Sequence, residues 1–142
     1  MRWTDGRRLA VALLAAIAIL PVRTVTFTGT RTERFHYGFR YYKQLAGVTT
    51  PTIFLAPGPY PKHFDYCAWV VRDIETGAVK VGINNDNPLC LPMKPEEMAL
   101  HEVCHIRMAH TSAPFDNAMS PETKESEVSE CMKGYDARRE NR

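Results

Sequence analysis

One pentapeptide, HEVCH, constrains this 142-residue chain more than any other feature of its sequence. Pro95 and the acidic turn after it predict a helix that continues to about His110. Because residues i and i+4 share one helix face, His101 and His105 can both bind one tetrahedral zinc ion. Glu102 beside them can take a proton from an attacking water and pass it to a leaving amine. The pentapeptide therefore predicts a site for one zinc ion per chain, with Glu102 as the catalytic residue.

A zinc peptidase needs a third protein ligand, and the sequence leaves its identity open. No histidine lies six residues after His105, where the metzincin pattern would place it. A carboxylate of the last predicted helix can take this position, and three are in range: Glu125, Glu127 and Glu130. We favour Glu127, because it lies one turn before Cys131, which a disulfide to Cys104 would hold near the zinc helix. Glu125, nearer the apolar helix face, and Glu130 are the alternatives.

The N-terminal 22 residues form a region of their own. Three arginines precede an apolar run from Leu9 to Leu20, which Pro21 ends. This pattern predicts a secretory signal or a retained signal anchor, with a buried helix as a third alternative. An uncleaved signal would contact the membrane through residues 9–20. We expect a linker over residues 23–30 and one domain over residues 31–142, periplasmic, secreted or anchored in the membrane.

Export would place the chain in an oxidising compartment, where cysteines pair. We therefore predict two disulfides, Cys104–Cys131 and Cys67–Cys90. The formal charge of +2 is too small for a nucleic-acid-binding protein that acts through bulk charge. We expect no nucleic-acid partner.

The rest of the chain predicts a small α+β domain. Aromatic and aliphatic residues at helical spacing predict a helix from Arg31 to the stop at Gly47, weakened by Gly38. β-Branched and aromatic runs predict three strands, over residues 52–56, 66–74 and 78–83, the last two joined as a hairpin. Ser120-Pro121 predicts the start of a last helix that reaches about Tyr135.

The segments HEVCH and ESEVS, residues 101–105 and 125–129, resemble those of gluzincins. They are most similar to the minimal zinc peptidases of the ImmA/IrrE type, whose HELGH and ExEAN segments they match in part. The resemblance covers residues 95–135. It implies a zincin-like domain with a backing helix, a small sheet with a β-hairpin, the HExxH helix and a helix with the ligand glutamate. It places Glu127 at the family's ligand position and His110 at a further histidine.

Three departures from the family pattern bear on what can be carried over. Cys104 replaces glycine, Ser129 replaces asparagine and Cys131 replaces an aromatic residue. The family is also usually cytoplasmic, whereas the N-terminal pattern of this chain predicts export. The resemblance therefore implies the fold and the zinc site, and not the family's partners.

These features together predict a zinc metallopeptidase that hydrolyses peptides or proteins. An extended substrate would pair with a sheet edge at residues 68–73 or 78–83. His110 would contact substrate or an oxyanion; Arg107 and Tyr135 are further candidates whose ordinary roles are a solvated position and packing. The alternatives are a non-catalytic zinc-binding envelope protein and a disulfide-stapled interaction protein.

Overall fold

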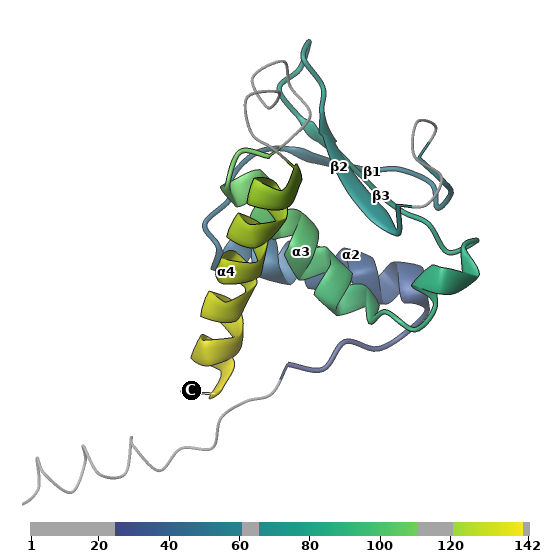
Figure 1. Cartoon of the computed structure of the whole chain (residues 1–142). Coiled ribbons are helices and arrows are strands. Elements are labelled where there is room, and N and C mark those ends of the chain that lie inside the picture. Colours follow the sequence, from purple (N-terminus) through teal and green to yellow (C-terminus); the bar gives the residue numbers. More distant parts are fainter. Residues whose placement is uncertain (1–24, 61–65, 111–120, 141–142) are drawn as a thin grey trace, which may run out of the picture.

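A computed structural model describes residues 25–60, 66–110 and 121–140 of the chain (Figure 1). The predicted signal or anchor lies outside this part. The elements are α2 (Arg31–Leu45), β1 (Thr52–Phe54), β2 (Ala68–Arg72), β3 (Val79–Ile83), the 3-10 helix η1 (Pro88–Cys90), α3 (Pro95–Arg107) and α4 (Pro121–Glu140). The predicted α+β class is confirmed. No helix in the described ranges is both long enough and apolar enough to cross a bilayer.

Helix α2 begins with a capping box, which was not predicted from the sequence. The Thr30 hydroxyl accepts a hydrogen bond from the Glu33 backbone N–H, and the Glu33 carboxylate accepts one from the Thr30 N–H. Phe27, in the segment expected to be a linker, packs its ring against Tyr41 and Tyr42. The described part of that segment has no regular secondary structure, but it packs on the domain.

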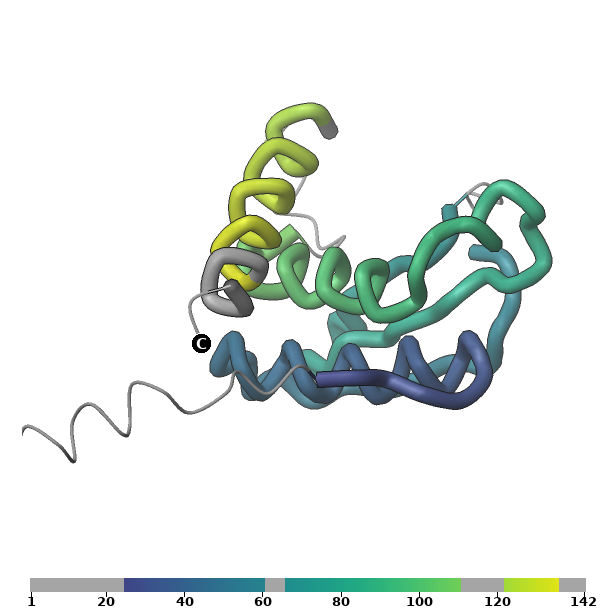
Figure 2. The backbone as a smooth tube through the Cα atoms, turned by 90° about the horizontal axis from the view of Figure 1, so that it is seen from below, coloured from purple at the N-terminus to yellow at the C-terminus, as the bar shows by residue number. Residues whose placement is uncertain are grey.

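Helices α2 and α3 lie side by side beneath the sheet and run in the same direction (Figure 2). Gly38 allows them to approach, because a β-carbon there would lie 3.2 Å from the Glu96 backbone and 3.4 Å from the Ala99 side chain. Arg34 donates hydrogen bonds to both carboxylate oxygens of Glu96, the shortest at 2.7 Å. The glycine that weakened the predicted helix is therefore the contact point with its neighbour.

The sheet has the strand order β1-β3-β2, with β1 parallel and β2 antiparallel to β3. The predicted hairpin is confirmed, and Gly77 in its turn adopts a positive φ of 72°. Both predicted hairpin strands are shorter than expected. Residues 78–83 cannot be the substrate edge, because β3 has a strand on each side. Among the described strands, β2 is an edge.

The core lies between the helices and one face of the sheet. Side chains of β2 and β3 on this face meet the aromatic stripe of α2 and the apolar side of α3. Its fully buried large side chains are Phe35, Phe39, Val79, Val81, Ile83, Val103 and Val128. This core fixes the position of α3, and with it the face that carries the two histidines.

Helix α3 ends at Arg107, three residues before the predicted end. The His110 N–H donates to the His105 carbonyl at 2.7 Å, and the Ala109 N–H donates to the Ile106 carbonyl at 3.0 Å. This pair of bonds is a Schellman motif, and it puts Ala109 in the left-handed region with a φ of 59°. The sequence has no glycine at this position to signal the end of the helix.

Both predicted disulfides are present, and no described cysteine is free. Cys67–Cys90 links the residue just before β2 to the last residue of η1. Cys104–Cys131 links α3 to α4, which crosses one end of α3 (Figure 1). The second disulfide therefore holds the two helices that carry the predicted ligands.

Candidate metal centre

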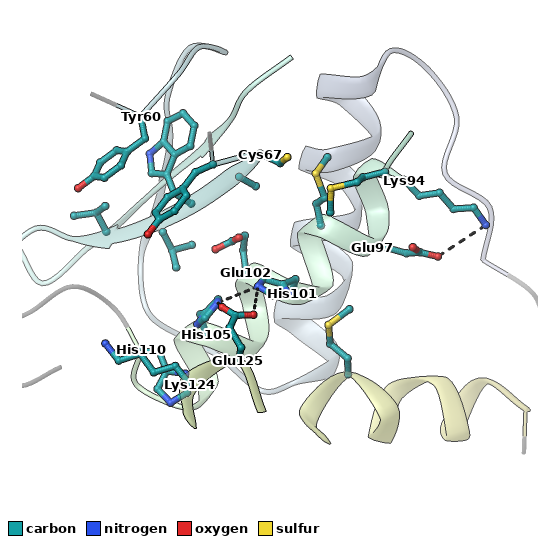
Figure 3. A pocket seen from close by; sticks show the side chains of 18 of the residues that line it. Tyr60, Cys67, Lys94, Glu97, His101, Glu102, His105, His110, Lys124 and Glu125 are labelled. Carbon is teal, nitrogen blue, oxygen red and sulfur yellow. Dashed lines mark hydrogen bonds and ion pairs between the residues drawn. The ribbon is translucent and has the colours of Figure 1, made fainter. Parts of the chain in front are cut away.

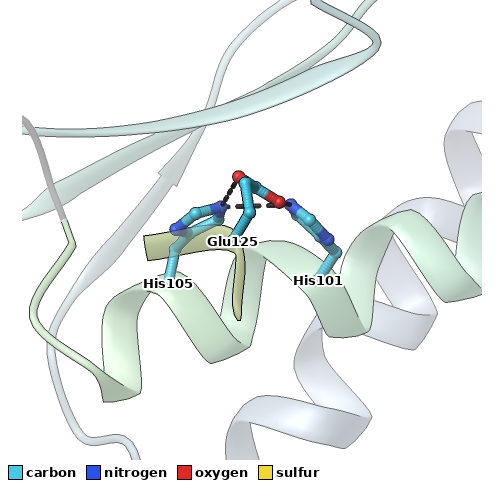
Figure 4. Close-up of side chains that lie close together, drawn as sticks. All are labelled: His101, His105 and Glu125. Carbon is cyan, nitrogen blue, oxygen red and sulfur yellow. Dashed lines mark hydrogen bonds and ion pairs between the residues drawn. The ribbon is translucent and has the colours of Figure 1, made fainter. Parts of the chain in front are cut away.

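Three side chains from α3 and α4 converge on one point. They are His101, His105 and Glu125, which we name the metal group. One ligand atom from each lies within 4.8 Å of the other two. Figure 4 shows both imidazoles on the same face of α3, with the carboxylate of α4 across them. The two Nε2 atoms are 3.0 Å apart, and each lies 3.3 Å from an oxygen of the carboxylate. This group could hold a metal ion.

The separations fit such an ion. In a tetrahedral zinc site with bonds of about 2.0–2.1 Å, ligand atoms lie about 3.3 Å from one another. The three measured separations, 3.0, 3.3 and 3.3 Å, are close to that value. Two facing imidazole nitrogens can share only one proton, so at least one of them presents a lone pair to the other. A cation between them would satisfy both.

The structure does not bring Glu127, the favoured third ligand, to the two histidines. Glu127 Oε2 lies 2.8 Å from Nε2 of His110, and Glu125 occupies the position beside the two histidines. Glu130 pairs with Lys133 at 2.9 Å instead. The alternative glutamate, Glu125, is therefore the one that the fold brings to the group.

His110 lines the same cavity as the metal group, but its contacts differ from the predicted contact with a substrate or an oxyanion. Its side chain is 2% exposed and its Nε2 is paired with Glu127. Its Nδ1 is buried and has no hydrogen-bond partner among the described residues. Its ring packs on His105, with centroids 5.5 Å apart. In this arrangement neither ring nitrogen of His110 is presented to a substrate.

Arg107 and Tyr135 also have structural roles in the described part of the chain. The Arg107 guanidinium donates to the Tyr135 hydroxyl at 2.8 Å and lies 5.9 Å from the centre of its ring. Neither residue lines the cavity beside the metal group. Their contact instead joins the end of α3 to α4.

Burial favours the neutral forms of His101 and His105, which are the forms that bind a metal. Desolvation, followed by the charges of His101, His110 and Lys124, lowers the pKa of His105 to about 3. Desolvation also lowers the pKa of His101, although the carboxylate of Glu125 opposes this effect. Neutral imidazoles offer lone pairs to a cation at physiological pH.

Glu102 lies next to this group in a different environment. It is 6% exposed and lines the same cavity. Burial, reinforced by the charge of Glu125, raises the pKa of Glu102 to about 8. A carboxyl group with a pKa near neutrality suits a residue that both accepts and donates a proton.

A cavity of about 840 Å³ connects these residues to the sheet (Figure 3). One wall is the edge strand, through Ala68, Trp69, Val70 and Val71, and another is α3, through Met98 and the HEVCH face. Tyr60 and Tyr66 extend the cavity past the strand. Local sequence signals did not mark Tyr60, Tyr66 and Trp69 as part of a site, because Tyr60 lies in a proline-rich loop and Tyr66 and Trp69 fit a strand pattern.

Comparisons with models of protein families, with curated proteins and with solved structures find no match to this chain. The geometry of the described residues is therefore the basis for any functional conclusion.

Proposed function

We propose that this protein is a zinc-dependent metallopeptidase of the gluzincin type with a zincin-like fold. The observation that carries the proposal is the convergence of His101, His105 and Glu125 beside the buried carboxyl group of Glu102 in one cavity. A metal group without a proton acceptor beside it would support only metal binding. A proton acceptor placed beside it supports hydrolysis.

In the proposed site, His101, His105 and Glu125 hold the ion. When bound, zinc polarises a peptide carbonyl, lowers the pKa of a water molecule and favours the ionised form of Glu102. Glu102 accepts a proton from the water whose oxygen attacks the carbonyl carbon. It then donates this proton to the amide nitrogen as the C–N bond breaks, which yields a carboxylic acid and an amine.

The edge strand β2 supports a peptide or a protein as substrate. An extended peptide can add to a sheet edge through main-chain hydrogen bonds, whatever its sequence. Residues Ala68–Val71 border the cavity that contains Glu102 and the metal group. A peptide paired with β2 would therefore bring its carbonyl groups to the site.

The two disulfides support action in an oxidising compartment, as the basic and apolar N-terminal segment predicts. We therefore place the protein in the periplasm or outside the cell, free or anchored.

Two variants of the full-length chain test the proposal. We expect one zinc per chain in the wild type and in Glu102→Gln, and none in His101→Ala, by elemental analysis after dialysis. With zinc bound, the wild type should cleave peptides of a random library, and Glu102→Gln should lose at least about 100-fold in rate. A Glu102→Gln variant that cleaves as fast as the wild type would overturn the mechanism. Zinc binding without any cleavage would leave a non-catalytic zinc protein.

A further inference from the structure

Three aromatic side chains border the cavity on the side of β2 away from the core. The rings of Tyr60 and Tyr66 are parallel, with an interplanar angle of 4° and centroids 6.2 Å apart. The Trp69 ring lies 5.6 Å from that of Tyr60. All three line the cavity that contains the metal group. We name these three residues the aromatic cluster; Figure 3 shows Tyr60 and the metal group on opposite sides of the strand.

The register of the hairpin places the cluster on the outer face of the sheet. Val70 pairs with Val81 in the core, so Trp69, one residue earlier, points to the other face. Trp69 pairs with Gly82, and its indole ring occupies the space that a β-carbon on Gly82 would need. Glycine in a central strand costs stability. Here it lets the indole lie against the sheet.

The side chains of a peptide paired with β2 would point alternately to the two faces of the sheet. Side chains that turn inward would meet Met98 and the residues of the metal group on α3. Side chains that turn outward would meet Trp69, Tyr66 and Tyr60. None of these three side chains is charged, and their rings form a large apolar wall on the outer side of the cavity. Such a wall stabilises an aromatic or long aliphatic side chain.

We propose that the aromatic cluster is a specificity subsite, which binds one large apolar side chain, best an aromatic one, of the peptide paired with β2. This inference rests on the proposed function, since the paired peptide is the proposed substrate. The exposure of Tyr66, 44%, leaves ring surface that a bound side chain can cover. The substrates would then have an aromatic residue at a fixed distance from the bond that is cut.

Binding tests this inference separately from catalysis. The probes are fluorescein-labelled heptapeptides of alanine and glycine with one variable position, occupied by phenylalanine, leucine, alanine or aspartate. A peptide with a single large side chain takes whichever register seats that side chain. Fluorescence anisotropy is measured with the full-length, zinc-loaded Glu102→Gln variant, which holds peptides without cutting them. We expect the phenylalanine peptide to bind about tenfold more tightly than the alanine peptide.

Tyr66→Ala and Tyr37→Ala form a matched pair. Both tyrosines are about half exposed, at 44% and 52%, but Tyr37 lies on α2 and does not line the cavity. In the Glu102→Gln background, Tyr66→Ala should reduce the preference for phenylalanine about threefold or more, and Tyr37→Ala should leave it unchanged. Gly82→Ala, which displaces the indole ring, should also reduce it.

The outcomes separate the inference from the proposed function. Peptide binding with no preference for phenylalanine, or a preference that Tyr66→Ala leaves intact, would overturn the subsite even if the wild type cleaves peptides. A preference that depends on Tyr66, without cleavage by the zinc-loaded wild type, would support the subsite and overturn the hydrolytic function. No binding of any of these peptides would overturn the subsite, and the proposed function as well if the wild type cleaves nothing in the random library. Cleavage by the wild type at one fixed distance from the phenylalanine supports both.

Discussion

Glu127 Oε2 lies 2.8 Å from His110 Nε2, so the carboxylate that the sequence favoured as a metal ligand pairs with a buried histidine instead. Glu125, two residues earlier on α4, faces the two histidines of α3. The two glutamates therefore have separable roles, and the first prediction compares them.

Glu125→Ala should lower zinc affinity by more than about 100-fold, because losing even a residue that supports a ligand costs about 10–100-fold. Glu127→Ala should change zinc affinity by less than about threefold. It should instead destabilise the fold by about 1–3 kcal/mol, because it removes the partner of a buried imidazole. Competition with a fluorescent chelator gives the affinities, and urea unfolding gives the stabilities. The reverse order of zinc affinities would return Glu127 to the ligand position.

The Cys104–Cys131 disulfide should support metal binding as well as stability, because it joins α3 to the helix that carries Glu125. Replacing both cysteines by alanine should lower the free energy of unfolding by about 2–4 kcal/mol and also lower zinc affinity.

The Cys67–Cys90 disulfide provides the control. Its cysteines are 23 residues apart, against 27 for the other pair, so the two loops have similar closure entropy. Replacing this pair should lower stability by a similar amount and leave zinc affinity nearly unchanged, as measured on the folded protein. Equal losses of zinc affinity in both double variants would show that α4 needs no tether to α3.

Ala109 should be a site where glycine stabilises the protein. Its φ of 59° costs an alanine about 1 kcal/mol relative to glycine. Ala109→Gly should raise the free energy of unfolding by about that amount. Gly47→Ala is the converse test: Gly47 has a φ of 68° after α2, and nothing lies within 4 Å of the added β-carbon. Backbone strain alone should therefore destabilise that variant, by about 1 kcal/mol.

In the metal-free protein, the contributions of His105 and Glu102 to stability should depend on pH in opposite directions. His105 has a folded pKa of about 3, below its ordinary 6.5, so the unfolded chain binds more protons between these values. Its contribution to stability is lost as the pH falls from 6.5 toward 3. Glu102 has a folded pKa of about 8, above its ordinary 4.5. Its contribution is lost as the pH rises from 4.5 to 8.

Unfolding in urea, with a chelator present, separates these effects. The stability of the wild type relative to Glu102→Gln should fall between pH 5 and pH 8, by at most about 1.4 kcal/mol per pH unit. Relative to His105→Ala, it should rise between pH 4 and pH 6. A pH-independent difference for Glu102→Gln would mean that the Glu102 carboxyl group is solvated in the metal-free protein.

Much of the fold follows from local sequence signals, and the third ligand shows where those signals end. The HEVCH helix and the hairpin were predictable because each depends on spacing within a short segment, and the two disulfides because export to an oxidising compartment favours pairing of the four cysteines. On α4, Val128, Cys131 and Met132 mark the packed side, and Glu125 and Glu127 flank it at helical spacing on either side. Only the angle at which α4 crosses α3 decides between them, and that angle depends on tertiary packing.

Local sequence signals also could not predict that β2 lies at an edge of the sheet. Residues 68–73 and 78–83 have similar composition, and either could have been the edge. The short strand β1 decides the matter by pairing in parallel with β3, through only three residues. A three-residue strand carries too little pattern to reveal its partner. The aromatic cluster was missed because it brings Tyr60, from a proline-rich loop, against Tyr66 and Trp69, and this contact depends on tertiary packing.

The two disulfides have a consequence for how the chain is oxidised. Each joins cysteines that are consecutive in the sequence, so the loops they close neither cross nor enclose one another. Four cysteines allow three pairings, and this is the one obtained when an oxidant joins each new pair of thiols as the chain arrives from its N-terminal end. Cys67 and Cys90 can be joined before Cys104 is present. Joining the cysteines in the order in which they emerge then gives the native disulfides directly, and no disulfide exchange is needed.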